Sequence, residues 1–163
     1  MCTLLFFAGC GGMGVIVPSS DSTPPTAELT AIVSSTTADE TITLTSASEP
    51  VTRELLPDKP IKFLAIGRDE DGGVKNITIA GALTVFCKGE EIGLSIHYFA
   101  NNPDEAMVGD RALTSRATAL SIDPATLCAA SSIQKVQGPF SAIAENFHDG
   151  TNTTAGFTLI IQP

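Results

Sequence analysis

The chain has 163 residues, of which 9 are Lys or Arg and 18 are Asp or Glu, so its net charge is −9. Its length is typical of one domain, and the 43% of hydrophobic residues excludes a disordered chain because a packed core can form. The acidic balance excludes the basic surface that binds nucleic acid, and two His residues leave few ligands for a histidine metal centre.

The N-terminal 20 residues carry no charge, and the apolar residues 4–9 lead directly to Cys10. A membrane-spanning helix needs about 20 apolar residues, so this run is more similar to the end of the apolar region of a secretory signal peptide. Ala8-Gly9-Cys10 resembles the lipobox of bacterial lipoproteins, with Phe7 where that motif usually has Leu and with no basic residue before the run. The resemblance implies that residues 1–9 are a truncated signal peptide and that Cys10 carries a diacylglycerol membrane anchor.

Residues 11–25 are rich in Gly, Ser, Thr and Pro, a composition typical of a flexible tether. We therefore expect a lipidated Cys10 and linker over residues 10–25 and a folded domain over residues 26–163. The expected location is the bacterial cell envelope, on the periplasmic side or at the surface. The alternative is a disordered N-terminal tail in which Cys10 is incidental.

The folded region shows short alternating segments and no run of ten or more residues with a 3.6-residue period. In chain order, the expected strands lie within residues 29–33, 41–45, 61–66, 74–79, 83–87, 92–98, 118–122, 140–145 and 153–161. Residues 61–66 are nearly all apolar, which is typical of a central strand buried on both faces. Pro50, Pro57 and Pro60 predict a loop before that strand, and Asp123-Pro124 predicts a short helix over residues 124–130.

This number of strands in about 140 residues predicts an all-β, antiparallel sandwich with one short helix. Residues 61–81, IKFLAIGRDEDGGVKNITIAG, resemble the strand B to strand C portion of bacterial immunoglobulin-like domains. Residues 140–162, FSAIAENFHDGTNTTAGFTLIIQ, resemble the final F–G hairpin of the same superfamily, which includes PKD-like and fibronectin type III-like domains. The resemblance implies an immunoglobulin-like β-sandwich, and it does not extend to residues 89–137.

Two of the four cysteines are candidates for a disulfide. If Cys2 leaves with the signal and Cys10 carries lipid, Cys87 and Cys128 remain, and an even pair in an exported protein favours a bridge. The enclosed loop of roughly 40 residues corresponds to about 4 kcal/mol in the chain-entropy description. Two separately buried thiols are the alternative.

Candidate chemistry is sparse, and no cofactor is expected. Asp69 and Asp71 precede a Gly-Gly turn, and carboxylates at alternate positions can bind calcium. Ala80 stands where an EF-hand loop needs its final Glu, so the alternative is a turn in which Asp accepts backbone N–H bonds. His97, on the outward face of a strand, and His148, in a hairpin turn, are interpreted as surface residues rather than a metal site or an acid–base pair.

Two functional classes remain. The first is a non-catalytic envelope module with a binding, adhesion or spacer role, which contacts a protein or glycan at the cell surface and no nucleic acid. In the loop over residues 101–111, Met107 and Val108 are either contact residues or packed back onto the sheet. The second class is an envelope enzyme or accessory domain with its site in residues 89–137, which would need a pocket with converging carboxylates.

Overall fold

The computed structural model describes residues 23–34, 38–56, 59–88, 94–103, 106–108, 111–128 and 133–161. These residues form strands and one short 3-10 helix. The strands are β1 (Thr26–Ser34), β2 (Asp39–Thr45), β3 (Val51–Leu55), β4 (Ile61–Arg68), β5 (Val74–Cys87), β6 (Leu94–Asn101), β7 (Met107–Val108), β8 (Arg111–Ala112), β9 (Ser115–Ile122), β10 (Ile133–Asn146), β11 (Thr151–Thr153) and β12 (Phe157–Ile161). The helix, η1, spans Pro124–Thr126.

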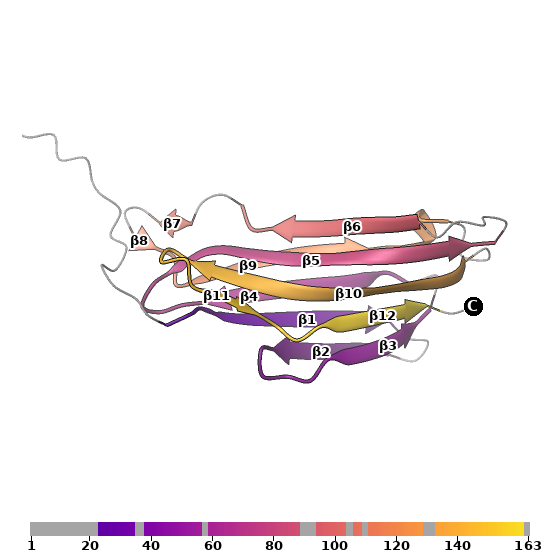
Figure 1. Ribbon diagram of the computed structural model, residues 1–163, viewed down its shortest axis with the longest axis horizontal. Helices are drawn as coiled ribbons and strands as arrows, with labels where there is room; N and C mark the ends of the chain where they lie inside the picture. The colour runs from indigo at the N-terminus through magenta and orange to yellow at the C-terminus, as the bar shows by residue number, and fades with distance from the viewer. Residues whose placement is uncertain are drawn as a thin grey trace, which may run out of the picture.

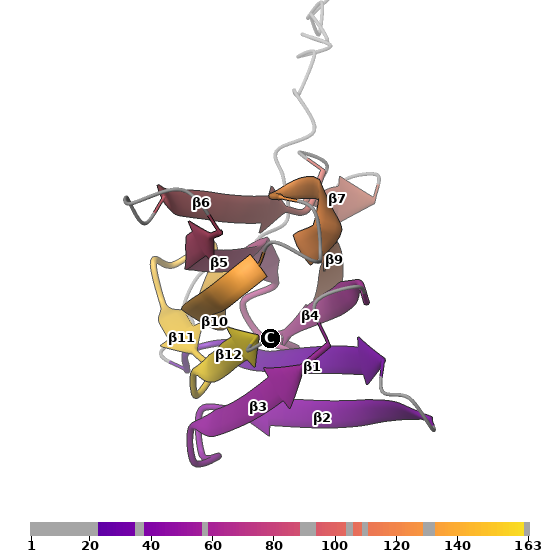
Figure 2. The same ribbon diagram turned by 90° about the vertical axis from the view of Figure 1, so that its right-hand side faces the viewer.

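Two sheets face each other across one core, as the end-on view in Figure 2 shows. One has the order β2-β1-β4-β9, and the other has the order β3-β12-β10-β5-β6, with β11 paired to β10. The consecutive strands β4 and β5 lie in opposite sheets, as strands B and C do in immunoglobulin-like sandwiches. Within the described residues the two sheets form a sandwich, so the predicted all-β sandwich is confirmed.

The sheets are long and narrow, with β5 and β10 running nearly the length of the molecule in Figure 1. Both strands have 14 residues and are longer than the sequence suggests. β5 joins the two expected strands over residues 74–79 and 83–87, and β10 begins at Ile133 rather than at Phe140. The join at Gly81 is covered by the ring of Phe140, its cross-strand partner, which fills the space that a side chain on Gly81 would need.

The expectation that residues 61–66 are buried on both faces is wrong. In β4, Ile61, Phe63 and Ala65 face the core, while Lys62 and Leu64 face solvent. The strand is central in its sheet, between β1 and β9. The second sheet of the sandwich covers only one face of it, and the other face is in contact with solvent. The exposed Leu64, with 38% of its surface accessible, makes this strand look doubly buried in the sequence.

The predicted loop before β4 is also wrong in part. Residues Val51–Leu55 form β3, which pairs in parallel with β12 and is the one parallel pairing among the described strands. Among the described strands β3 is the last of its sheet and pairs on one side only, which is a position where a neighbouring proline such as Pro50 is tolerated. The predicted helix at Asp123-Pro124 is confirmed but is short, ending at Thr126, with the Asp123 carboxylate accepting from the Ala125 N–H at 3.0 Å.

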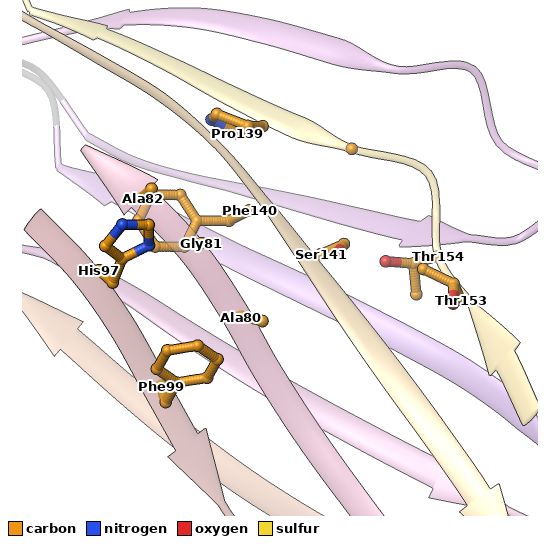
Figure 3. A pocket seen from close by; sticks show the side chains of 11 residues that line it. Ala80, Gly81, Ala82, His97, Phe99, Pro139, Phe140, Ser141, Thr153 and Thr154 are labelled. Atoms are coloured by element: carbon orange, nitrogen blue, oxygen red, sulfur yellow. The ribbon is translucent and has the colours of Figure 1, made fainter. Parts of the chain in front are cut away.

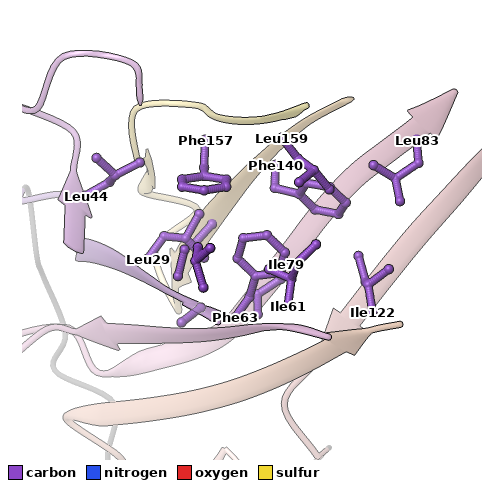
Figure 4. Close-up of a cluster of buried hydrophobic side chains, with 14 of the residues drawn as sticks. Leu29, Leu44, Ile61, Phe63, Ile79, Leu83, Ile122, Phe140, Phe157 and Leu159 are labelled. Carbon is purple, nitrogen blue, oxygen red and sulfur yellow. The ribbon is translucent and has the colours of Figure 1, made fainter. Parts of the chain in front are cut away.

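The core is built around three phenylalanines contributed by both sheets (Figure 4). The ring centroids of Phe63, from β4, and Phe140, from β10, lie 4.8 Å apart in a stacked arrangement. The ring centroids of Phe157, from β12, and Phe63 lie 5.7 Å apart in a T-shaped arrangement. Since the sequence contains no Trp, these rings supply the bulk that joins the two sheets.

Candidate binding face

The outer face of the sheet containing β6 carries an exposed aromatic residue. Along β6 the side chains alternate, with Ile96, Tyr98 and Ala100 half-buried against the core and His97 and Phe99 pointing outward. Phe99 has 68% of its surface accessible, the largest exposure of any described large hydrophobic residue. A ring of this size on the outer face is available for contact with another molecule.

Phe99 borders a shallow groove that crosses β6, β5 and β10. The groove has a volume of about 530 Å³. Its lining includes Ala80, Ala82, His97, Phe99, Pro139 and Ser141. Figure 3 shows His97 and Phe99 projecting from β6 beside Ala80 and Ala82, with Pro139 on the neighbouring strand. A second hollow of about 330 Å³ shares Ala82 and Pro139 and extends across β12. We refer to the two hollows together as the outer groove.

The outer groove follows from small residues and one proline at adjacent positions. Ala80 and Ala82 on β5 leave space above the sheet, whereas longer side chains would fill it. Pro139 faces Ala82 across the β5–β10 ladder and has no N–H to donate there. Gly138 allows the two backbones to approach, because a Cβ at that position would overlap the Ala82 carbonyl oxygen.

Among the described residues, the outer groove lacks acidic side chains, Lys and Arg, and His97 is its one imidazole. Ser141, Thr153 and Thr158 add hydroxyl groups to otherwise apolar walls. Such a surface offers apolar contact and neutral hydrogen bonds rather than charge.

The calcium candidates lie elsewhere, in the turn between β4 and β5. The Asp69 carboxylate is buried, and its Oδ1 accepts from the N–H groups of Asp71, at 3.2 Å, and Gly72, at 2.6 Å. Its Oδ2 accepts from the Asn146 side chain at 3.1 Å, while Asp71 is exposed. Within the described ranges, no three His, Cys, Asp or Glu side chains group as a metal site would need. These hydrogen bonds are those expected of an Asp side chain that accepts backbone N–H groups to order a turn.

Met107 is not among the residues that line the outer groove. Met107 and Val108 both lie in β7, which pairs with β8 at one end of the sandwich, and the Met107 side chain is half-buried. The segment after β8 is bound to the β4–β5 turn, because the N–H of Val74 donates to the Leu113 carbonyl at 2.7 Å. The Val108 side chain lies outside the described part of the structure.

The unmatched residues 89–137 contain two buried polar side chains that join strands. Asn102, just after β6, donates its N–H to the Ile77 carbonyl at 3.2 Å, and its Oδ1 accepts from the Ile77 N–H. The Arg116 guanidinium, from β9, donates to the Lys75 carbonyl at 3.1 Å and also to the Pro103 carbonyl. These contacts hold the end of β6 against β5 and β9.

The remaining predicted residues are scattered. The Sγ atoms of Cys87, at the end of β5, and Cys128, just after η1, lie 2.20 Å apart, at disulfide distance. His148 is half-buried in the turn after β10, on a different element from His97. Cys10 lies outside the described residues, in which no helix is long and apolar enough to span a membrane.

Two groups have shifted pKa values. The Lys75 ammonium lies 2.6 Å from the Glu145 carboxylate, and this hydrogen bond raises the pKa of Lys75. Partial burial raises the pKa of Tyr98, which lies on the inner face of β6 against Phe140. Neither group lines the outer groove.

The sequence places Phe99 on the outward face of its strand but does not by itself identify it as a site residue. A large aromatic residue among polar and small outward neighbours is the available signal. The groove beside it depends on Ala82 and Pro139, from strands far apart in the sequence, and local patterning cannot find such a juxtaposition. No family model and no curated protein matches this sequence.

Proposed function

We propose that this chain is a non-catalytic module of the bacterial cell envelope that binds a surface protein or glycan through the outer groove. The observation that carries the proposal is the exposed Phe99 ring beside a hydroxyl-bearing hollow. Single exposed apolar residues are common on proteins, but an aromatic side chain at the rim of a groove provides both contact area and a defined position for a ligand.

The proposed location rests on the N-terminal sequence and on the cysteines. The lipobox-like Ala8-Gly9-Cys10 and the tether-like residues 11–25 favour attachment to a membrane through a lipid on Cys10. A cysteine pair at disulfide distance favours an oxidising compartment such as the periplasm or the cell surface. In this arrangement the tether would carry the sandwich away from the membrane.

Binding is tested with Phe99→Ser and with a matched control on the same face. Thr52→Ala changes an exposed residue of β3 that pairs with Thr158 but lines neither hollow. Glycan binding is measured with an array of purified polysaccharides and with intact peptidoglycan sacculi. Protein binding is measured by photo-crosslinking on live cells. Loss of a signal in Phe99→Ser with retention in Thr52→Ala supports the proposal, and equal signals from all three proteins contradict it.

The anchor is tested separately by mass spectrometry of the chain purified from bacterial membranes. A diacylglyceryl mass on an N-terminal Cys10 is expected, and Cys10→Ser should move the protein to the soluble fraction. Cys2→Ser is the control and should remain in the membrane. An unmodified chain that still begins at Met1 would contradict the location while leaving the binding result intact.

A further inference from the structure

β6 is the last strand of its sheet and lacks the features that normally protect such a strand. Among the described strands, none pairs with the outer edge of β6. Its sequence, LSIHYFAN, contains no Lys, Arg, Asp, Glu or Pro over eight residues. By contrast, the other edge strands contain charged residues, which are Asp39, Glu40, Arg53 and Glu54 in β2 and β3 and the inward-facing Arg116 in β9. Natural edge strands usually carry charges, prolines or bulges that prevent pairing with another chain.

We propose that β6 joins two copies of this chain, with the two β6 strands antiparallel across a twofold axis. The backbone geometry identifies which groups are available. The N–H of Asn102 donates to the Ile77 carbonyl, so by alternation the even-numbered residues of β6 bond to β5. The odd-numbered residues therefore direct their N–H and C=O groups to the outer edge. These residues are Ser95, His97, Phe99 and Asn101.

One register uses all four of these residues. In an antiparallel pair, hydrogen bonds form between residues whose backbone N–H and C=O groups point toward the other strand. Each odd-numbered residue of β6 must therefore lie opposite an odd-numbered residue of the second copy. The register centred on Tyr98 places Ser95 opposite Asn101 of the second copy and His97 opposite Phe99 of the second copy. By the twofold symmetry each pair occurs twice, which makes the interface isologous.

The side chains of β6 are complementary to themselves in this register. On the outer face, each exposed Phe99 ring lies beside the imidazole of the other copy's His97, and cross-strand aromatic pairs stabilise sheets. On the inner face, the half-buried Ile96 and Tyr98 gain cover from the second strand. No charged side chain of β6 faces another, so local repulsion does not oppose the contact.

The net charge predicts how salt affects this association. Each copy carries −9, so two copies repel one another at long range. The screening length falls from about 10 Å at 0.1 M salt to about 3 Å at 1 M. Added NaCl should therefore strengthen the dimer, whereas it weakens contacts held by opposite charges. The inference does not depend on the proposed partner, because no third molecule takes part in the contact.

The experiment is analytical ultracentrifugation of the full chain with Cys2→Ser and Cys10→Ser, which removes lipidation and stray thiols. In this background, His97→Pro deletes an N–H that makes no bond to β5, and proline is tolerated where an edge strand's N–H faces solvent. His97→Ala keeps the N–H and is the matched control. We expect the dimer of His97→Pro to be weaker by about tenfold or more, since each dimer loses two hydrogen bonds, and His97→Ala to lose less.

Disulfide trapping tests the register without relying on proline. Tyr98→Cys places two thiols opposite each other across the axis, within the Cα separation that a disulfide allows, and should give a covalent dimer. Ile96→Cys faces Ala100 of the second copy and should not. The proposal is overturned by a chain that stays monomeric at high concentration and high salt. It is equally overturned if the chain dimerises but His97→Pro leaves the affinity unchanged and Tyr98→Cys forms no covalent dimer. Protection of the β6 amides from hydrogen exchange that appears only when a different protein is added would also overturn it.

Discussion

The side-chain amide of Asn146 donates to Oδ2 of Asp69 at 3.1 Å and so joins two turns that follow strands of opposite sheets. Asn146 is 1% exposed, and its Oδ1 accepts from the N–H groups of His148, at 3.0 Å, and Gly150, at 2.7 Å. Asp69, 7% exposed, closes the turn between β4 and β5. One pair of buried polar side chains therefore orders both turns at this end of the sandwich.

Replacing Asn146 by Ala should destabilise the fold by about 2–4 kcal/mol, because buried partners lose their hydrogen bonds. Urea unfolding measures the change. Asn152→Ala, in the neighbouring strand β11, is the control and should stay within about 0.5 kcal/mol of the parent. A double-mutant cycle with Asp69→Ala should show a coupling of about 0.5–3 kcal/mol. Equal losses for Asn146→Ala and Asn152→Ala would show that the buried pair has no special role.

Calcium should leave the melting temperature unchanged within experimental error. Both carboxylate oxygens of Asp69 already accept hydrogen bonds from the chain, three in all, which leaves little acceptor capacity for an ion. Differential scanning calorimetry with CaCl₂ and, as the control, with MgCl₂ at the same ionic strength measures this. A melting temperature that rises with calcium alone would restore the calcium interpretation of Asp69 and Asp71.

Most strands are predictable from the sequence where only one face is buried. The alternation of Leu29, Ala31 and Val33 predicts β1 and its core face, and the structure buries all three. β3 is missed because its pairing partner, β12, lies about a hundred residues away and its sequence, VTREL, is short. The apolar but exposed Leu64 leads to the wrong prediction that β4 is buried on both faces. Local sequence cannot show whether a second layer covers a strand.

The candidate site is less predictable than the fold. The prediction of a Cys87–Cys128 pair depends on assigning Cys2 to a signal and Cys10 to a lipid, and the structure brings the two remaining cysteines to disulfide distance. The outer groove instead depends on the register that places Pro139 beside Ala82. The sequence suggests Met107 as a contact residue because it is apolar in a polar loop. In the structure Met107 lies in β7, which pairs with β8 in a small hairpin. Register is a property of the whole sheet, so residues that share a face cannot be identified from one strand.

Gly81→Ala should destabilise the protein by about 1–3 kcal/mol through overpacking. A Cβ on Gly81 would overlap the Phe140 ring, which is itself held by Phe63 and cannot withdraw from the core. Gly156→Ala is the control, because a Cβ there meets no atom within 4 Å. Thermal unfolding of the two variants measures the difference. If Gly81→Ala is as stable as Gly156→Ala, the packing of Phe140 onto Gly81 is not tight.

Removing the Cys87–Cys128 link should destabilise the protein by about 4 kcal/mol, because the cysteines are 41 residues apart and the bridge restricts the unfolded chain. The double variant Cys87→Ala/Cys128→Ala and the reduced parent should unfold at similar urea concentrations. Cys2→Ser/Cys10→Ser is the control, and its stability should fall on addition of reductant as the parent's does. If reductant leaves the parent's unfolding midpoint unchanged, the two thiols are not bridged in solution.

Tyr98 offers a direct measurement of burial at β6, because it is the single tyrosine and the sequence has no tryptophan. Desolvation raises the pKa of Tyr98 above its ordinary value of 10.0, so tyrosinate absorbance in the folded protein should appear at higher pH than in the urea-unfolded chain. Above pH 10 the unfolded chain loses its phenolic proton first, and the stability of the fold therefore falls as pH rises. The raised pKa of Lys75 acts in the same direction, so Tyr98→Phe should reduce this fall without abolishing it. A folded midpoint at or below that of the unfolded chain would place the Tyr98 phenol in solvent rather than against Phe140.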